Sequence, residues 1–223
     1  GSNIVMLLKQ YWRVFLLEGL VTTLEFTCIA VVLGAILGTL VAMMKMSKSK
    51  IVRFLASVYI EVIRGTPILL QLYIFYFVLP SLLPFLNLSE FMWVAIAMCI
   101  NSSAYVSEVI RSGIQAVDRG QTEAARSLGM SQSRTMVHII LPQAVRNILP
   151  ALGNEFIILL KDTSLITVIG GKEMVYAAQA IYGRTYEQMF PLVGIAVVYL
   201  VLVLIFSYLQ SILERRLRQS DRR

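Results

Sequence analysis

Residues 123–142 read EAARSLGMSQSRTMVHIILP, a polar stretch that lies between long hydrophobic runs. Residues 114–128 are expected to form a helix that ends at Gly129, because glycine readily takes the positive φ that closes a helix. Ser131 or Ser133 can cap a second helix directly after this turn. The pattern therefore predicts two short helices joined by a tight turn.

The first of these helices has the features of a docking element. Ala124 and Ala125 are adjacent small residues that leave one helical face nearly bare, so another protein could approach its backbone closely. Glu123 and Arg126 are three positions apart and are therefore neighbours on the helix surface, where they can make ionic contacts. An ordinary solvated hairpin is the alternative interpretation of these residues.

The composition is that of an integral membrane protein. Hydrophobic residues make up 57% of the 223 residues, charged residues 15%, and the mean hydropathy is +0.74, which excludes a water-soluble domain. The strict alternation of a membrane barrel is absent, so the segments that cross the membrane are expected to be helices. The sequence therefore predicts an all-α integral membrane protein.

Uncharged runs long enough to cross a bilayer predict five spans within a single transmembrane domain, residues 1–223. The fourth run is the weakest, because Pro150, Gly153 and Glu155 interrupt it. A polar, interrupted span is expected to lie among other helices rather than against lipid. The predicted spans are residues 14–45, 53–80, 88–112, 146–161 and 188–213, with a cytoplasmic loop over residues 113–145.

The distribution of Lys and Arg predicts the orientation of these spans. Basic residues cluster in three places, whereas residues 80–90, between the second and third spans, carry none. By the positive-inside rule the basic segments are cytoplasmic, the N-terminus is outside and the C-terminus is inside. The charge of +7 is then explained by topology and lipid contact rather than nucleic-acid binding. The basic residues are Lys45, Lys48, Lys50 and Arg53; Arg119, Arg126, Arg134 and Arg146; and Arg215, Arg216, Arg218, Arg222 and Arg223.

Several chemical signatures are missing from the sequence. No G-x-x-x-x-G-K-[ST] segment occurs, so the chain is not expected to hydrolyse ATP by that route. His138 is the single histidine, and Cys28 and Cys99 lie apart in apolar runs, which predicts neither a metal site nor a disulfide. The chain is therefore not expected to be an enzyme.

The segment 123–142 resembles the EAA loop of ATP-binding-cassette (ABC) importers, the cytoplasmic segment that a separate ATPase grips. Gly129, Ile139, Leu141 and Pro142 follow Glu123 at the spacing of that loop. From about Tyr11 to Arg216 the chain resembles permease subunits of the polar amino acid uptake family of type I ABC importers. Further stretches typical of that family are Glu18-Gly19-Leu20, Thr22-Thr23-Leu24, Tyr59 to Pro67, Leu69 to Leu72, Asn101 to Tyr105, Ser107-Glu108 and Lys161 to Leu165.

This resemblance implies a five-helix fold in the prokaryotic cytoplasmic (inner) membrane that works as a dimer of identical or related permease subunits. It implies two copies of an ATPase, which bind ATP and Mg, an extracytoplasmic amino acid-binding protein, and no cofactor on this chain. ATPase closure and ATP hydrolysis would drive alternating access of the pathway. The residues expected to couple to the ATPase are Glu123, Ala124, Ala125, Arg126, Ser127, Leu128 and Gly129.

Three polar clusters in apolar surroundings are the candidates for the substrate path, because such groups usually face a cavity or the bundle interior. The cluster in the third span has i, i+4, i+7 spacing and so shares one helical face. We expect the clusters to converge on a pocket for a zwitterion. The alternative is that Glu61 and Arg64, or Lys161 and Asp162, form pairs that only stabilise the bundle or the dimer. The candidates are Glu61, Arg64, Gly65 and Thr66; Asn101, Tyr105 and Glu108; and Lys161, Asp162, Thr163 and Ser164.

The balance of charge in these clusters suggests the substrate class. Three carboxylates against two cations favour a basic amino acid such as arginine, lysine or histidine, while glutamine remains open. A channel or secondary carrier that needs no ATPase is the alternative function, and intramembrane charge is the feature that speaks for it. The EAA spacing and the lack of an internal repeat speak against it.

Overall fold

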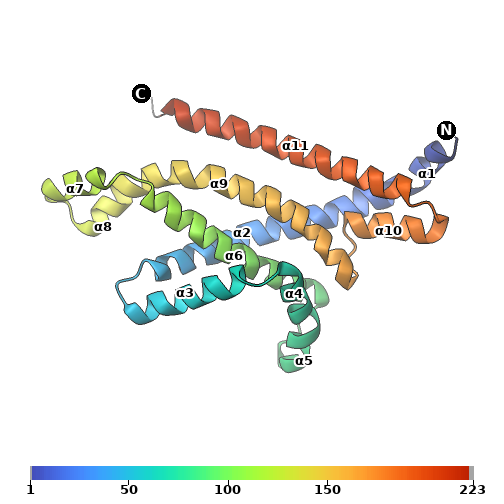
Figure 1. Cartoon of the computed structure of the whole chain (residues 1–223), viewed down its shortest axis with the longest axis horizontal. Helices are drawn as coiled ribbons and strands as arrows, with labels where there is room; N and C mark the ends of the chain where they lie inside the picture. The colour runs from blue at the N-terminus through green and yellow to red at the C-terminus, as the bar shows by residue number, and fades with distance from the viewer. Residues whose placement is uncertain (1, 221–223) are drawn as a thin grey trace.

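The computed structural model describes residues 2–220, which form helices and connecting turns without any strand. Figure 1 shows α2, α6, α9 and α11 running roughly along the long axis of the molecule. The elements are α1 (Ser2–Arg13), η1 (Val14–Gly19), α2 (Leu20–Lys45), α3 (Lys50–Arg64), α4 (Ile68–Tyr73), η2 (Ile74–Val78), α5 (Leu79–Leu82), η3 (Pro84–Leu86), α6 (Glu90–Gln115), α7 (Arg119–Ser127), α8 (Gln132–Thr135), η4 (Met136–Ile140), α9 (Leu141–Asp162), η5 (Thr163–Ile169), α10 (Met174–Thr185) and α11 (Met189–Ser220).

Three helices of the described chain are long and apolar enough to cross a membrane: Lys9–Lys45, Glu90–Gln115 and Met189–Gln219. Lys50–Arg64 and Ile68–Leu82 make a fourth span if the two are counted together, although they meet at 99°. The predicted second span is therefore a broken helix. The predicted fourth span lies in α9, whose polar residues keep it below the hydropathy of a simple membrane helix. The number of five spans stays a prediction.

The core lies where α2 packs along α6. Gly34 and Gly38 of α2 face α6 at close range: a Cβ on Gly34 would lie 2.5 Å from Ser102 Oγ, and one on Gly38 would lie 2.8 Å from the Ser103 carbonyl oxygen. Small residues let membrane helices approach in this way. The buried apolar side chains around this contact are Phe26, Ala30, Leu72, Val94, Ala97, Met98, Leu159, Ile166 and Ile169.

The two ends of the molecule differ in character. Figure 1 shows α7, α8, the turn between α2 and α3, and the C-terminal end of α11 at one end, with α1 and α10 at the other. The segments that carry the three predicted cytoplasmic groups of basic residues lie at the first end, and Arg222 and Arg223 lie outside the described residues.

The prediction of one helix over residues 114–128 is wrong in its first turn. Asp118 leaves the helical conformation and caps α7 through its side chain, 2.6 Å from the Gly120 N–H nitrogen.

Candidate functional site

The break between α3 and α4 positions the first polar cluster. Gly65 ends α3, and Pro67, with extended ψ of 138°, precedes α4. Proline has no N–H to continue the helix and disfavours helical geometry in the residue before it. Arg64 is thereby left at the exposed end of α3, with Thr66 at the corner of the bend.

The predicted polar face of α6 lies opposite this break. Arg64 is stacked over the Tyr105 ring, with 5.6 Å between the guanidinium carbon and the ring centroid. Arg64 Nη1 also lies 3.9 Å from Glu108 Oε2, whereas Arg111 Nη2 lies 2.7 Å from the same oxygen. Glu108 therefore interacts with two arginines, and the nearer one holds it to its own helix. Asn101 is nearly buried, and its Nδ2 donates to Gln71 Oε1 at 2.9 Å.

Two acidic residues of α9 complete a cavity of about 450 Å³. Glu155 and Asp162 line it from α9, one near the middle of that helix and the other at its C-terminal end. The remaining walls come from the α3–α4 break and from α6. We call this space the inner cavity; its lining residues are Arg64, Gly65, Thr66, Pro67, Ile68, Asn101, Tyr105, Glu155, Ile158, Leu159 and Asp162.

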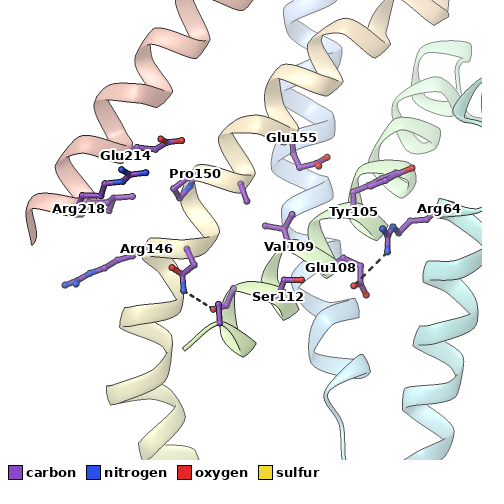
Figure 2. A pocket seen from close by; sticks show the side chains of 15 residues that line it. Arg64, Tyr105, Glu108, Val109, Ser112, Arg146, Pro150, Glu155, Glu214 and Arg218 are labelled. Carbon is purple, nitrogen blue, oxygen red and sulfur yellow. Dashed lines mark hydrogen bonds and ion pairs between the residues drawn. The ribbon is translucent and has the colours of Figure 1, made fainter. Parts of the chain in front are cut away.

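A larger cavity of about 750 Å³, the basal cavity, adjoins the inner cavity and shares Arg64, Tyr105 and Glu155 with it. Figure 2 shows residues of α6 and α9 around this space, with Glu214 and Arg218 of α11 on its far side. The two adjoining cavities together form a passage between α3, α6, α9 and α11 that both apolar and charged side chains line. Such a passage can hold a small charged molecule inside a membrane bundle.

Five of the candidate residues do not line the inner cavity, and one of them, Glu108, lines the basal cavity instead. Glu61 lines neither cavity, and among residues 2–220 Arg64 forms an ion pair with Glu108 instead of Glu61. Thr163 is fully buried, and its hydroxyl donates to the Leu160 carbonyl at 2.7 Å. Lys161 and Ser164 line a separate, mostly apolar groove between α9, α10 and α11. Within the described chain, Lys161 and Asp162 form no ion pair with each other.

Two residues of the site are absent from the candidates derived from the sequence. Glu155 lines both cavities, and the signal was present, because it is a lone carboxylate in an apolar run. Gln71 does not line the inner cavity but bonds to the residues of the α3–α4 break. Its signal was weaker: a polar residue four positions after Pro67, the distance of one helical turn.

The polar segment around residues 123–142 forms two short helices with a tight turn, as predicted. Gly129 has φ of +85°, and its N–H donates to the Arg126 carbonyl at 3.0 Å. Ser131, rather than Ser133, caps α8 by accepting from the Arg134 N–H at 3.3 Å. The turn is therefore closed by the glycine and the serine together.

The surface of this segment differs from the expectation at one alanine. Ala125 is 5% exposed and packs toward the chain itself, so only Ala124 presents a small side chain outward. Leu128 is 86% exposed at the tip. Glu123, Arg126, Ser127 and Gly129 are exposed as well. The outer surface of the segment thus has a prominent apolar residue surrounded by polar ones.

A metal centre is not supported by the described residues, among which no group of three His, Cys, Asp or Glu side chains could hold an ion. The chemistry available in the cavities is that of charge and hydrogen bonding. A guanidinium on one side and two carboxylates on the other can bind a molecule that carries charges of both signs.

Comparison with known proteins gives consistent matches along the chain. The profile of the family described as "binding-protein-dependent transport system inner membrane component" matches residues 30–219. The putative glutamine transport system permease protein GlnP of Rickettsia bellii is 42% identical over 91% of this chain and 93% of its own length. The arginine transport system permease protein ArtQ of Bacillus subtilis is 42% identical over 93% of this chain and 94% of its own length.

Solved structures agree with these matches. A crystal structure of an amino acid ABC transporter with histidines superposes with a TM-score of 0.90 at 47% identity, covering 95% of this chain and 97% of that one. An inward-facing form of the methionine ABC transporter MetNI superposes with a TM-score of 0.74 at 15% identity, a level that shows a shared fold alone.

Proposed function

Since the chain belongs to the family of binding-protein-dependent transport system inner membrane components, we propose that it forms the translocation pathway of an ATP-driven importer for polar, basic amino acids. It is a permease subunit of an amino acid ABC importer and not itself an enzyme. The observation that carries the proposal is the inner cavity, in which Arg64 faces the carboxylates of Glu155 and Asp162 within a membrane bundle.

The charges of the inner cavity support a substrate with a carboxylate and an extra cation. Arg64 can bind the α-carboxylate of an amino acid, and Asp162 and Glu155 can bind its amino group and a cationic side chain. Glu108 contributes less negative charge, because Arg111 and Arg64 both interact with it. Two carboxylates then remain for one cation of the protein, which favours arginine, lysine or histidine. The names of the relatives, which refer to arginine and glutamine, are compatible with this class or its uncharged neighbour.

Coupling to ATP hydrolysis is assigned to the segment of α7 and α8. Its exposed residues, Glu123, Ala124, Arg126, Ser127, Leu128 and Gly129, form a convex surface suited to a groove on a partner. We place one ATPase, with its ATP and Mg, on this surface of each permease subunit of a dimer, and an extracytoplasmic amino acid-binding protein at the opposite end. Closure of the two ATPases would bring the two segments together and switch the side from which the cavities open.

The proposed orientation puts α7, α8 and the C-terminus in the cytoplasm and the N-terminus outside. In Figure 1 the basic segments of the described chain gather at the end that carries α7 and α8. This agreement between charge and the position of the coupling segment supports the inner membrane as the location, with ATP on the correct side.

ATP hydrolysis in proteoliposomes tests the function. The chain is co-expressed with the ATPase whose gene neighbours its own. ATP hydrolysis is measured in the presence of the amino acid-binding protein of the same system and one amino acid at a time. Stimulation by arginine, lysine or histidine above that by glutamate is expected. The alternative, a channel or carrier without an ATPase, predicts no stable complex with the ATPase and uptake that responds to ionophores but not to ATP.

A further inference from the structure

The bend between α3 and α4 leaves backbone carbonyl groups without their helical partners. In a continuous helix the Ile63 carbonyl would accept from the N–H of residue 67, which is a proline here and has none. The Val62 carbonyl accepts from the Thr66 hydroxyl at 2.8 Å. Unpaired carbonyls inside a membrane bundle are costly, so a broken helix is tolerated only where other groups bind them.

Gln71 binds the carbonyl that the proline leaves unpaired. Its Nε2 lies 2.8 Å from the Ile63 carbonyl oxygen, 3.2 Å from the Thr66 carbonyl oxygen and 2.8 Å from Thr66 Oγ1. Gln71 is on the first turns of α4, so one side chain joins the end of α3 to the start of the next helix. Because Gln71 is 5% exposed, water has little access to replace it.

The other end of the same amide is fixed by α6. Asn101 Nδ2 donates to Gln71 Oε1 at 2.9 Å, and Asn101 is itself 5% exposed. Asn101 lies on the face of α6 that carries Tyr105 and Glu108, the two side chains that contact Arg64. The chain of hydrogen bonds therefore connects the bend to the helix that forms the opposite wall of the inner cavity.

We propose that Gln71 is a positioning residue of the transport pathway: it holds the Gly65–Pro67 bend against α6 and thereby sets where Arg64 and Thr66 stand in the inner cavity. The residue does not line that cavity, so it acts through the backbone of its neighbours. Asn101, one of the candidates for substrate contact, then has a second role as the anchor of Gln71. The effect of Gln71 on substrate binding rests on the proposed function, whereas its effect on the bend does not.

The first test measures the bend without any substrate. Ile68 lines the inner cavity directly after the bend, so Ile68→Cys, in a chain whose Cys28 and Cys99 are replaced by alanine, reports on access through its rate of modification by a charged, water-soluble thiol reagent. Loss of the two strongest bonds of Gln71 is expected to change this rate about tenfold in Gln71→Leu. An unchanged rate overturns the proposal.

Gln210→Leu is the matched control. Gln210 also donates through Nε2 to a backbone carbonyl, that of Pro150, at 3.0 Å. This bond joins α11 to α9 and lies away from the bend. It should leave the modification rate of Ile68→Cys unchanged. An equal change in both variants would mean that the bend responds to any loosening of the bundle, which also overturns the proposal.

The second test measures binding of radiolabelled arginine, lysine and histidine to the permease–ATPase complex in nanodiscs without the binding protein. Gln71→Leu is expected to weaken binding about tenfold, with ATPase association and ATP hydrolysis in the absence of substrate retained. Gln71→His, which keeps a ring N–H donor, should restore part of the affinity. If the unmodified complex binds none of these amino acids, the proposed substrate class fails, while the thiol measurement still decides the role of Gln71.

Discussion

The loop before α10 is built around one buried carboxyl side chain, and its removal should destabilise the fold. Glu173 is fully buried. It caps α10 by accepting from the Val175 and Tyr176 N–H groups, both at 2.9 Å. The Tyr199 hydroxyl of α11 donates to Glu173 Oε2 at 2.9 Å, and the Thr167 hydroxyl of η5 donates to Oε1.

The magnitude follows from these four bonds. Loss of a helix cap costs about 1 kcal/mol, and each buried hydroxyl that loses its acceptor costs about 1.5 kcal/mol, so Glu173→Ala should lower the free energy of unfolding by about 4 kcal/mol. Glu173→Gln keeps the shape: the hydroxyl that faces the new amide nitrogen can reverse to accept, and the other still donates to the amide oxygen. The amide nitrogen also faces a backbone N–H, at a cost of about 2 kcal/mol. Tyr199→Phe removes one donor and leaves three, for about 1.5 kcal/mol.

Unfolding of the purified protein by SDS in mixed micelles, followed by far-ultraviolet circular dichroism, measures the three variants on one scale. We expect Glu173→Ala to lose the most, with Glu173→Gln and Tyr199→Phe well behind it. A loss in Glu173→Ala no larger than that in Tyr199→Phe would refute the reasoning, because it would mean that the caps of α10 and the Thr167 bond contribute nothing. The same holds if all three variants unfold like the parent protein.

Three further outcomes are expected. Gly38→Ala should cost about 2 kcal/mol in the same unfolding assay, because its Cβ would lie 2.8 Å from a backbone carbonyl of α6, whereas Gly183→Ala, with no atom within 4 Å, should be neutral or slightly stabilising; similar values for the two would contradict this. Leu128→Glu should weaken ATPase association in pull-down titrations at least about tenfold, since it puts a charge on the most exposed apolar side chain of the coupling segment; unchanged association would remove Leu128 from that interface. Asp162→Asn should lower amino acid-stimulated ATP hydrolysis at least about tenfold with the complex still assembled; full stimulation would take Asp162 out of the substrate site.

The class of fold and the main turns could be predicted from the sequence because they depend on local chemistry. Apolar runs predict membrane helices whatever their partners are, and Gly129 is expected at a positive φ because it is the glycine that directly follows a helical segment. The proline at position 67 likewise predicts a break wherever it lies. Which group binds the carbonyl that the break leaves free depends on a side chain from another turn of the chain, and here that side chain is Gln71.

Side-chain direction at helix ends could not be predicted in the same way. Lys161 and Asp162 are adjacent, so helical geometry turns them about 100° apart, and only the packing of α9 decides which one faces the cavity. Ala124 and Ala125 present the same problem on α7, where the chain buries one of the two against itself. Sequence spacing selects a face relative to other residues of the same helix, whereas the neighbours of that face come from the tertiary fold.

The charges around the inner cavity are not balanced within the protein. Two arginines compete for Glu108, and their distances are unequal: Arg111 lies at 2.7 Å on the same helix, and Arg64 lies at 3.9 Å on another. The shorter pair is bonded through two guanidinium nitrogens, Nε and Nη2, so most of the negative charge of Glu108 is engaged by Arg111. Arg64 therefore retains positive charge that Glu108 does not fully balance, in the cavity that Glu155 and Asp162 also line. An amino acid placed there would give Arg64 a carboxylate partner and give the two acids a cation, so that the charges of the cavity are complementary to the substrate rather than to one another.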